Sequence, residues 1–276
     1  MSASLESVGT FGETTRPVSL TFQSLRSSSS GNCLLLCCGD HSILIDCGLK
    51  TQKECRALLD AHAGRLRGVL VTHAHGDHIC YSALKIMQAY GTPVYCHDDV
   101  LPHVHRKHVG RLNSPLELTP FAGEAAVDVG GFGVRAFPVP HEPQCPTFGF
   151  VITCGNKKLV VCTDFHDPDA IRPHLCDADF VFIEANHDPH LLRLHPNYAS
   201  HFHLSNAKAA RLLCDAARAG RCAPRHVMLG HLSEQRNTES LARHAVTDHF
   251  ADEDVDVDFE LSLAPRRTAS QVVTIA

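Results

Sequence analysis

The sequence lacks several features that would assign it quickly to a class of protein. No apolar stretch approaches the ~20 residues that a membrane-spanning helix needs, so we expect no membrane partner. The polar residues 1–17 contain no apolar segment of the kind found in signal peptides. There is no basic tail, and a formal net charge of −5 gives no sign of nonspecific binding to nucleic acid. These absences favour a globular protein, which we expect in the cytoplasm.

Paired cysteine motifs are absent as well. The 13 cysteines are odd in number, lie mostly inside apolar runs and include no C-x-x-C pair. A chain of 276 residues with 44% hydrophobic residues can build a sizeable core without a disulfide framework. We therefore expect free thiols that pack in the core of a protein kept in a reducing compartment.

What the chain does contain is an alternation of short β-type runs and helical segments, with no long linker and no tandem repeat. Strand-like runs cover residues 18–25, 33–38 and 42–48, and helical patterns cover 51–63 and 79–90. Two facing sheets with helices on their outer faces would bury most of these runs. The pattern therefore predicts an α/β fold with two sheets.

The second half of the chain continues in the same way. Its clearest helix follows Ser205, a plausible N-cap, and ends before Gly220, a plausible C′ residue, with apolar residues at helical spacing between them. A further helix is expected over about 237–249. We expect residues 1–17 to form a flexible leader and residues 18–276 to form a single domain.

The most informative stretch is THAHGDH, residues 72–78, which directly follows an apolar run. His73 and His75 are two positions apart, and in extended backbone such side chains point the same way, so both can reach one ion. Asp77 and His78 follow where the chain turns towards the next helix, and they can serve a second ion. H-x-H-x-D-H is thus a short scaffold for two metal ions. The alternative is a chance cluster in a chain with 21 histidines.

Two ions need more ligands than this loop supplies, and polar residues at the ends of other strand-like runs are the candidates. His141, Asp164 and His231 each follow an apolar β-type run. Asp164 can bridge two ions because a carboxylate has two oxygens. Imidazole and carboxylate groups suit zinc, and also manganese or iron. The alternative for each residue is a strand-end side chain that bonds only the neighbouring backbone.

With these residues the sequence resembles the metallo-β-lactamase superfamily, whose signature is H-x-H-x-D-H. Within it, the stretches SSSSGNCLLL, LVVCTDFHD, FIEANHD, HLSNAKAARLL and LGHLSEQRN resemble the YycJ/WalJ group of bacterial hydrolases, over roughly residues 20–240. The resemblance implies a four-layer αββα sandwich with a dinuclear site at one edge. It assigns seven metal ligands: His73, His75 and His141 to one ion, Asp77, His78 and His231 to the other, and Asp164 to both.

The resemblance also implies an activity. The group is associated with phosphodiester cleavage, including 5′-exonuclease action on DNA. We therefore expect a phosphodiesterase or 5′-exonuclease that acts on nucleic acid through a hydroxide shared by two Zn or Mn ions, with iron as a further possibility. Two alternatives stay open, because a fold does not decide a function. One is a thioester or amide hydrolase of the glyoxalase-II type, and the other is a regulatory protein that binds metal without catalysis.

Asp77, His203 and Asp46 are the candidate catalytic residues. Asp46 ends a strand-like run and could fix the tautomer of a ligand imidazole by accepting its hydrogen bond, or it could simply cap a turn. His203, just before a predicted helix, could contact a phosphate or protonate the leaving oxygen. Ser30 and Asn32, in the SSSSGN turn, could line the same mouth.

Two further clusters carry weaker signals. Glu184 and His187 in IEANHD could approach the metals or bond only the backbone at a strand end. The three histidines of HVHRKH, within residues 103–108, are expected on a solvated helix face.

Overall fold

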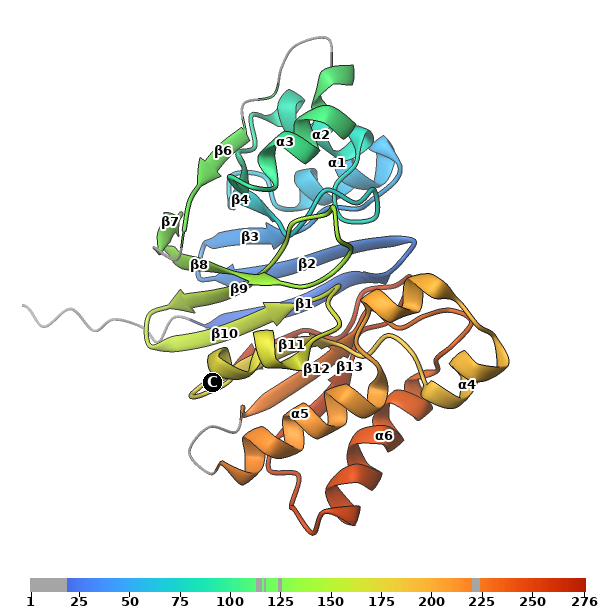
Figure 1. Ribbon diagram of the computed structural model, residues 1–276. Helices are drawn as coiled ribbons and strands as arrows, with labels where there is room; N and C mark the ends of the chain where they lie inside the picture. Colours follow the sequence, from blue (N-terminus) through green and yellow to red (C-terminus); the bar gives the residue numbers. More distant parts are fainter. Residues whose placement is uncertain (1–18, 113–115, 117, 124–125, 220–223) are drawn as a thin grey trace, which may run out of the picture.

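Two seven-stranded sheets face each other in the middle of the molecule, and helices lie on their outer faces (Figure 1). The computed structural model describes residues 19–276 except 113–115, 117, 124–125 and 220–223. The expected leader and the expected helix end at Gly220 lie outside this part of the chain, and the single domain stays a prediction. The predicted αββα arrangement is confirmed.

The first sheet is antiparallel at one end and parallel at the other. It contains, in spatial order, β14 (Val273–Ile275), β1 (Leu20–Ser28), β2 (Gly31–Cys38), β3 (His41–Ile45), β4 (Leu66–Val71), β5 (Val94–His97) and β6 (Leu118–Phe121). Strands β3 to β6 run parallel. Parallel neighbours need crossover connections, and these are α1 (Gln52–Ala61), α2 (Tyr81–Tyr90) and α3 (Leu101–Lys107). A short 3₁₀ helix, η1 (Val109–Arg111), follows α3.

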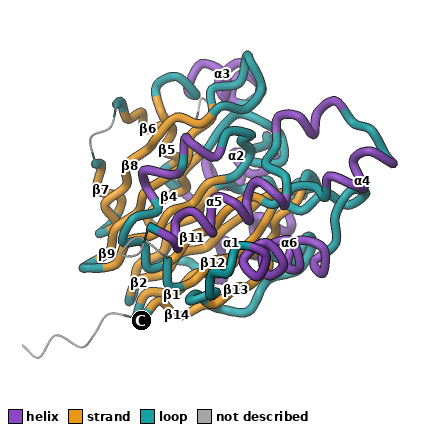
Figure 2. The backbone as a smooth tube through the Cα atoms, turned by 60° about the horizontal axis from the view of Figure 1, so that its bottom comes forward, coloured by secondary structure: helices purple, strands orange, loops and turns teal. Residues whose placement is uncertain are grey.

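The second sheet is likewise antiparallel at one end and parallel at the other. It contains, in spatial order, β13 (Glu260–Leu263), β12 (His226–Gly230), β11 (Phe180–Glu184), β10 (Lys157–Cys162), β9 (Thr147–Cys154), β8 (Phe132–Val139) and β7 (Val127–Val129). Strands β10 to β13 run parallel. Helices α5 (Asn206–Arg218) and α6 (Glu239–Asp252) cover its outer face, whereas α4 (Pro189–Leu194) projects from the edge of the molecule (Figure 2). Three short 3₁₀ helices complete this half: η2 (Pro168–Ala170), η3 (Arg172–His174) and η4 (Tyr198–Phe202).

Apolar side chains from both sheets form the central core. The ring of Phe22 on β1 lies 4.4 Å from the ring of Phe180 and 5.7 Å from that of Phe182, both on β11, as centroid distances. A second apolar cluster lies between the second sheet and helices α5 and α6. Complete burial of one such side chain stabilises the fold by about 2 kcal/mol, so the core holds the two sheets in a fixed relation.

The longer predicted elements are confirmed. Helices α1 and α2 fall within the predicted ranges, and α5 begins after Ser205, whose hydroxyl accepts a hydrogen bond from the backbone N–H of Lys208. Strands β6, β7 and β14 were not predicted. Each has only three or four residues and lies at a sheet edge, so none shows a long enough apolar pattern. Among the described residues, no helix is both long and apolar enough to cross a membrane.

The expectation of free thiols throughout is wrong for two cysteines. Cys38 at the end of β2 and Cys154 at the end of β9 form a disulfide that joins the two sheets. They are 116 residues apart in sequence, so only the packing of the sheets brings them together. Ten other cysteines in the described part of the chain are free.

The parallel strands place the polar strand ends together. In the second sheet Cys162 pairs with Ile183, and Glu184 pairs with Gly230, so β10, β11 and β12 end at the same edge. In the first sheet Ile45 pairs with Leu70, so β3 and β4 end together as well. Carboxyl ends of parallel strands are the usual position of functional side chains in such sheets.

Candidate metal centre

The H-x-H-x-D-H stretch folds into a compact turn at the end of β4. The ring of His73 lies 4.7 Å from that of His75 and 4.1 Å from that of His78. The backbone N–H of His78 donates to the carbonyl of His75, which closes the turn. Gly48 packs against this turn so closely that a β-carbon there would lie 1.7 Å from the carbonyl oxygen of Asp77. Only glycine permits this approach, which fixes the position of Asp77.

Three residues from elsewhere in the chain reach this turn. His141 follows β8, and its ring lies 5.3 Å from those of both His73 and His75. Asp164 and His231 follow β10 and β12 and have positive φ angles of 57° and 51°. This left-handed conformation is uncommon outside glycine and costs of order 1 kcal/mol. Such strain at strand ends is typical of functional sites, where it directs a side chain into the site.

The structure brings all seven predicted ligands together. The potential ligand atoms of His73, His75 and His141 lie within 4.8 Å of one another, and so do those of Asp77, His78 and His231. Asp164 lies within the same distance of His73 from the first group and His78 from the second. A carboxylate between the two groups is in the position that a bridging ligand requires.

The hydrogen bonds leave free nitrogens directed at this space. Nε2 of His73, His141 and His231 is buried and has no hydrogen-bond partner. The other ring nitrogen is occupied: His141 Nδ1 donates to the carbonyl of Phe202 at 3.0 Å, and His73 Nδ1 lies 3.0 Å from the hydroxyl of Thr72. A buried nitrogen lone pair without a partner is unfavourable, and two cations, one near His73 and His141 and one near His231, would satisfy all three. The residues present therefore fit divalent metal ions.

Asp46 makes the hydrogen bond expected of it from the sequence. Its Oδ2 lies 2.7 Å from Nδ1 of His78 and accepts from the Thr72 hydroxyl at 2.8 Å, while its Oδ1 accepts from the Thr72 backbone N–H at 2.8 Å. Asp46 is buried and has a φ of 58°. This carboxylate orients the ring of His78 so that Nε2 points towards the other ligands.

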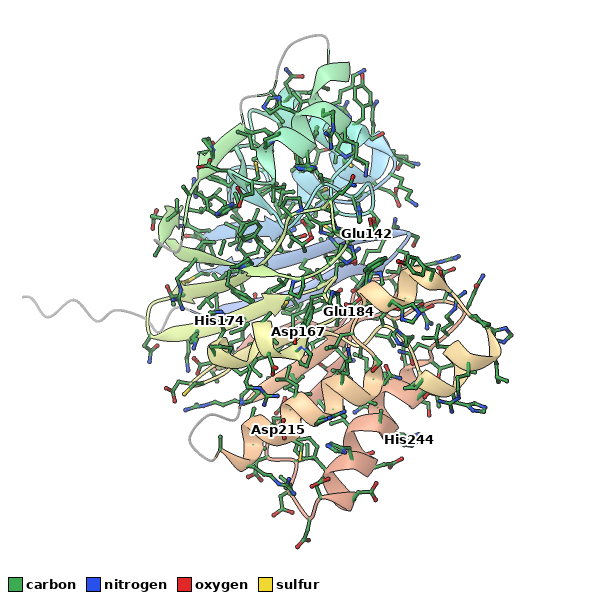
Figure 3. The ribbon with its side chains drawn as sticks, in the orientation of Figure 1. Glu142, Asp167, His174, Glu184, Asp215 and His244 are labelled. Carbon is green, nitrogen blue, oxygen red and sulfur yellow. A yellow bond between two sulfur atoms is a disulfide. The ribbon has the colours of Figure 1, made fainter. Side chains whose placement is uncertain are left out.

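Glu184 has the corresponding position on the second sheet. Its Oε1 lies 2.7 Å from Nδ1 of both His203 and His231, and its Oε2 accepts from the backbone N–H groups of Phe165 and Leu204. Glu184, labelled in Figure 3, lies inside the molecule, whereas the labelled Asp215 and His244 lie on the outer helices. Burial opposes the charge on Glu184, but the charge of His203 and the hydrogen bonds from His203 and His231 lower the pKa of Glu184 to about 2. Glu184 is therefore an ionised anchor.

The carboxylates and imidazoles of the centre shift one another's pKa. Burial opposes the charge on His231, but Asp164 and Glu184 help to raise its pKa to about 10. Burial likewise opposes the charge on His78, yet Asp164 and Asp46 raise its pKa well above the usual range. The same pairing holds the pKa of Asp164 well below its ordinary value despite burial. The carboxylates therefore stabilise positive charge here, as protons or as metal ions, and metal uptake would release protons.

One expectation about nearby residues needs correction, and the two possibilities for His187 stay open. His108 does not lie on a solvated helix face: it is buried, and its Nε2 lies 3.1 Å from the carbonyl oxygen of Ala74 in the signature turn. His187 belongs to none of the ligand groups found among the described residues. Of the two residues of the SSSSGN turn, Asn32 approaches the centre, with Nδ2 2.9 Å from Nε2 of His78, whereas Ser30 bonds to Ser28.

Sequence reasoning missed three supporting groups. Thr72 orients His73 and Asp46 but precedes the motif as an unremarkable strand-end threonine. Glu142 lies next to the predicted ligand His141 in sequence, and its Oε2 is 3.3 Å from Nε2 of His75. The carbonyl of Phe202 fixes His141, and a backbone group leaves no signal in sequence.

Comparison with known proteins agrees with this geometry. The family described as the beta-lactamase superfamily domain matches residues 41–231. The exodeoxyribonuclease WalJ of Streptococcus pneumoniae (strain D39) is 27% identical over 94% of this chain and 99% of its own length. The exodeoxyribonuclease YycJ of Bacillus anthracis is 28% identical over 83% of this chain and 88% of its own.

Among solved structures, the metallo-β-lactamase fold protein YhfI of Bacillus subtilis superposes with a TM-score of 0.66 at 18% identity, covering 93% of this chain and 99% of that one. A likeness at this identity concerns the fold alone. The family match spans well over half of the sequence and contains the signature turn with the other predicted ligands. The chain therefore belongs to the beta-lactamase superfamily.

Proposed function

We propose that the protein is a dinuclear metal-dependent phosphodiesterase that acts on nucleic acid, with exonucleolytic cleavage of DNA from a 5′ end as its reaction. The observation that carries the proposal is that seven imidazole and carboxylate groups converge in overlapping groups, within each of which the potential ligand atoms lie at most 4.8 Å apart. Support for the substrate comes from the two relatives named exodeoxyribonucleases, which match the chain over most of its length.

The proposed cofactor is a pair of divalent ions, zinc or manganese. The ligands would be His73, His75 and His141 for one ion, Asp77, His78 and His231 for the other, and Asp164 for both. Bound there, such ions would supply a hydroxide nucleophile at neutral pH and neutralise charge on the phosphate. Mixed nitrogen and oxygen donors suit both metals.

His203 is the proposed proton donor. Its Nδ1 is held 2.7 Å from Oε1 of Glu184 and 3.6 Å from Oδ1 of Asp164. Burial opposes the charge on this ring, but Glu184 and Asp164 raise its pKa and so favour the protonated imidazole. A sugar oxygen is a poor leaving group unless it is protonated, and a positioned imidazolium can supply that proton. Glu184 thus positions a ligand and a proton donor with one oxygen.

The alternatives make a different demand on the site. A thioester hydrolase expels a thiolate, which leaves readily without protonation because thiols are much stronger acids than sugar alcohols. A protein that only binds metal needs no proton donor at all. The hydrogen bonds from His203 and His231 to Glu184 therefore favour a reaction whose leaving group must be protonated, such as the sugar oxygen of a phosphodiester or the amine of an amide, and the two exodeoxyribonuclease relatives favour the phosphodiester.

The test is a substrate panel with purified protein loaded with zinc or manganese. We expect turnover of bis-p-nitrophenyl phosphate and of a 5′-labelled DNA strand, with mononucleotides released from the 5′ end. A thioester and a cephalosporin should be inert. Turnover of the thioester alone would contradict the proposal, and no turnover at full metal occupancy would favour a protein that binds metal without catalysis. Comparing the turnover of an RNA strand of the same sequence with that of the DNA strand shows which nucleic acid is the substrate.

We also propose a cytoplasmic location, because ten cysteines of the described residues remain free. The Cys38–Cys154 disulfide is the observation against it. Alkylation of intact cells followed by mass spectrometry would show whether these two thiols are paired in place.

A further inference from the structure

A hollow outside the metal centre is lined by the part of the IEANHD motif that the proposed function leaves unused. It has a volume of about 560 Å³ and lies between α4 and η4. Its lining includes His187, Leu192, Arg193, Asn197, Tyr198 and Ser205. This volume is within the range of pockets that bind small organic molecules.

One wall of the hollow carries an unusually exposed aromatic ring. The side chain of Tyr198 is 77% exposed, more than any other large hydrophobic residue among those described. Its ring is supported from behind by edge contacts with Phe202, at 5.4 Å, and His201, at 5.9 Å between centroids. A supported aromatic ring that faces solvent provides a flat surface on which another planar ring can stack.

A second feature near the hollow is a buried polar atom without a hydrogen-bond partner. His187 is only 6% exposed, and its Nδ1 makes no hydrogen bond. The backbone holds the residue in place, because its carbonyl accepts from the N–H of Asn206 at 2.9 Å. Burial lowers the pKa of His187 to about 4, so the ring is neutral and can offer its unpaired nitrogen to a neutral polar group. His187 lines the hollow, but Nδ1 itself has almost no exposed surface, so a ligand that bonds to this unsatisfied nitrogen must displace part of its cover.

The hollow is connected to the metal centre through a single short element. Tyr198 begins η4, and Phe202 ends it. The carbonyl of Phe202 fixes the predicted ligand His141, and His203 is the next residue. A polymer whose phosphodiester lies at the centre would therefore extend a neighbouring unit past η4.

We propose that this hollow binds one nucleobase of the strand that is cleaved at the metal centre, with Tyr198 stacked on the base and His187 bonded to its polar edge. A nucleobase has the two properties that the hollow selects, a flat aromatic face and neutral hydrogen-bonding groups at its rim. Stacking on aromatic side chains tolerates any base and contributes much of the affinity for single strands. The inference rests on the proposed function, and it assigns the site that holds the substrate beside the cleaved bond.

The experiment compares Tyr198→Ala with wild type as metal-loaded full-length proteins. Tyr198→Phe keeps the ring and is the conservative control. Tyr90→Ala removes another partly exposed tyrosine, on α2, and is the matched surface control. Metal content is measured for each protein, because η4 also contacts His141 through its backbone. The substrates are a single-stranded oligonucleotide, copies of it with one abasic position, and bis-p-nitrophenyl phosphate, which has no base.

We expect Tyr198→Ala to raise KM for the oligonucleotide by about tenfold, while both control variants retain the wild-type value. The comparison on bis-p-nitrophenyl phosphate uses kcat alone, which should be the same in all of them, because its nitrophenyl rings can also stack on Tyr198 and alter KM. In wild type, one abasic position near the cleaved bond should raise KM by a similar factor. The same abasic position should not raise KM further in Tyr198→Ala, because both changes remove the same stacking contact between the base and the ring. An unchanged KM with an abasic penalty equal to that of wild type would overturn the proposal.

Failure of the proposed function has a different signature. If wild type hydrolyses neither the oligonucleotide nor bis-p-nitrophenyl phosphate, binding of deoxyadenosine monophosphate and of deoxyribose 5-phosphate is measured by equilibrium dialysis. Preference for the probe that carries a base, lost in Tyr198→Ala, would keep the base site while the proposed reaction fails. Equal binding of the two probes would overturn the base site as well.

Discussion

Oε1 of Glu184 lies 2.7 Å from Nδ1 of His203 and 2.7 Å from Nδ1 of His231. One oxygen thereby fixes the tautomers of two imidazoles, and Nε2 of one of them, His231, is buried without a partner beside the proposed ligand Asp77. The N–H groups of Phe165 and Leu204 bond to Oε2 and prevent the carboxylate from turning. The orientation of a proposed metal ligand and of the proposed proton donor is thus set by a single buried side chain.

Replacement of Glu184 by Gln should therefore affect two properties at once. The amide has no charge, and only one of its two terminal atoms accepts hydrogen bonds. We expect metal affinity and kcat each to fall by about 10- to 100-fold. Metal titration and steady-state kinetics measure the two effects. The control is Glu260→Gln, which alters an exposed carboxylate paired with His226 at 3.2 Å, and it should change neither quantity. Wild-type affinity in Glu184→Gln would contradict the anchoring role.

Asp46→Asn tests the carboxylate on the first sheet. The asparagine oxygen can still accept from Thr72, but its amide nitrogen would meet Nδ1 of His78 as a second donor. The ring of His78 would then turn or change its tautomer, and we expect a metal affinity about 10- to 100-fold weaker. Asp99→Asn is the matched control, since Asp99 pairs with His97 at 3.4 Å near the surface. Unaltered binding of two ions by the Asp46 variant would show that His78 needs no such partner.

Asp164→Ala tests the bridging position. Removal of this carboxylate leaves His73 and His78 without the group that lies near both. We expect fewer than two metal ions per chain and turnover close to background, because both halves of the centre lose one ligand. Metal analysis by mass spectrometry and kinetics on bis-p-nitrophenyl phosphate measure these outcomes. Two bound ions with full activity would exclude a bridging role.

His203→Ala separates proton donation from metal binding. The variant should retain its metal ions, because His203 is not among the seven proposed ligands. On DNA we expect kcat to fall by about 100-fold or more, since the sugar oxygen must leave unprotonated. Bis-p-nitrophenyl phosphate should be affected little, because nitrophenolate leaves without a proton. The basic limb of the pH–rate profile on DNA should also disappear. Equal losses on both substrates would show that His203 acts in some other way.

The pH dependence of stability provides a test at His187. Its folded-state pKa of about 4 lies below the ~6.5 of an unfolded histidine, because burial disfavours the charged ring. The unfolded chain thus binds more protons between these values, and stability is lost as pH falls from about 6.5 towards 4. We expect this residue to account for about 1 to 2 kcal/mol of that loss, allowing for partial solvent access.

The measurement is urea unfolding of metal-free protein between pH 4 and 7. His187→Phe should show a smaller loss of stability over this range than wild type. His190→Phe, which alters an exposed neighbour on α4, should follow wild type. Identical pH profiles for His187→Phe and wild type would contradict the neutral, buried state of the ring.

The local features of this protein could be predicted from its amino-acid sequence. The H-x-H-x-D-H turn, the helix after Ser205 and the strand-end positions of Asp164 and His231 follow from short-range patterns, because side-chain periodicity and capping act over a few residues. The same patterns could not predict the short edge strands or the Cys38–Cys154 pair. Such features depend on which strands become neighbours.

The contacts that support the candidate site exist only in the folded chain. Glu184 reaches both His203 and His231, the Phe202 carbonyl fixes His141, and the buried His187 faces a separate hollow. These relations join residues that are 19 to 61 positions apart along the chain. Hydrogen bonds at such separations are set by strand register and by the packing of two sheets, which no local sequence pattern encodes. The ligand types are therefore readable from the sequence, whereas their orientation is a property of the assembled fold.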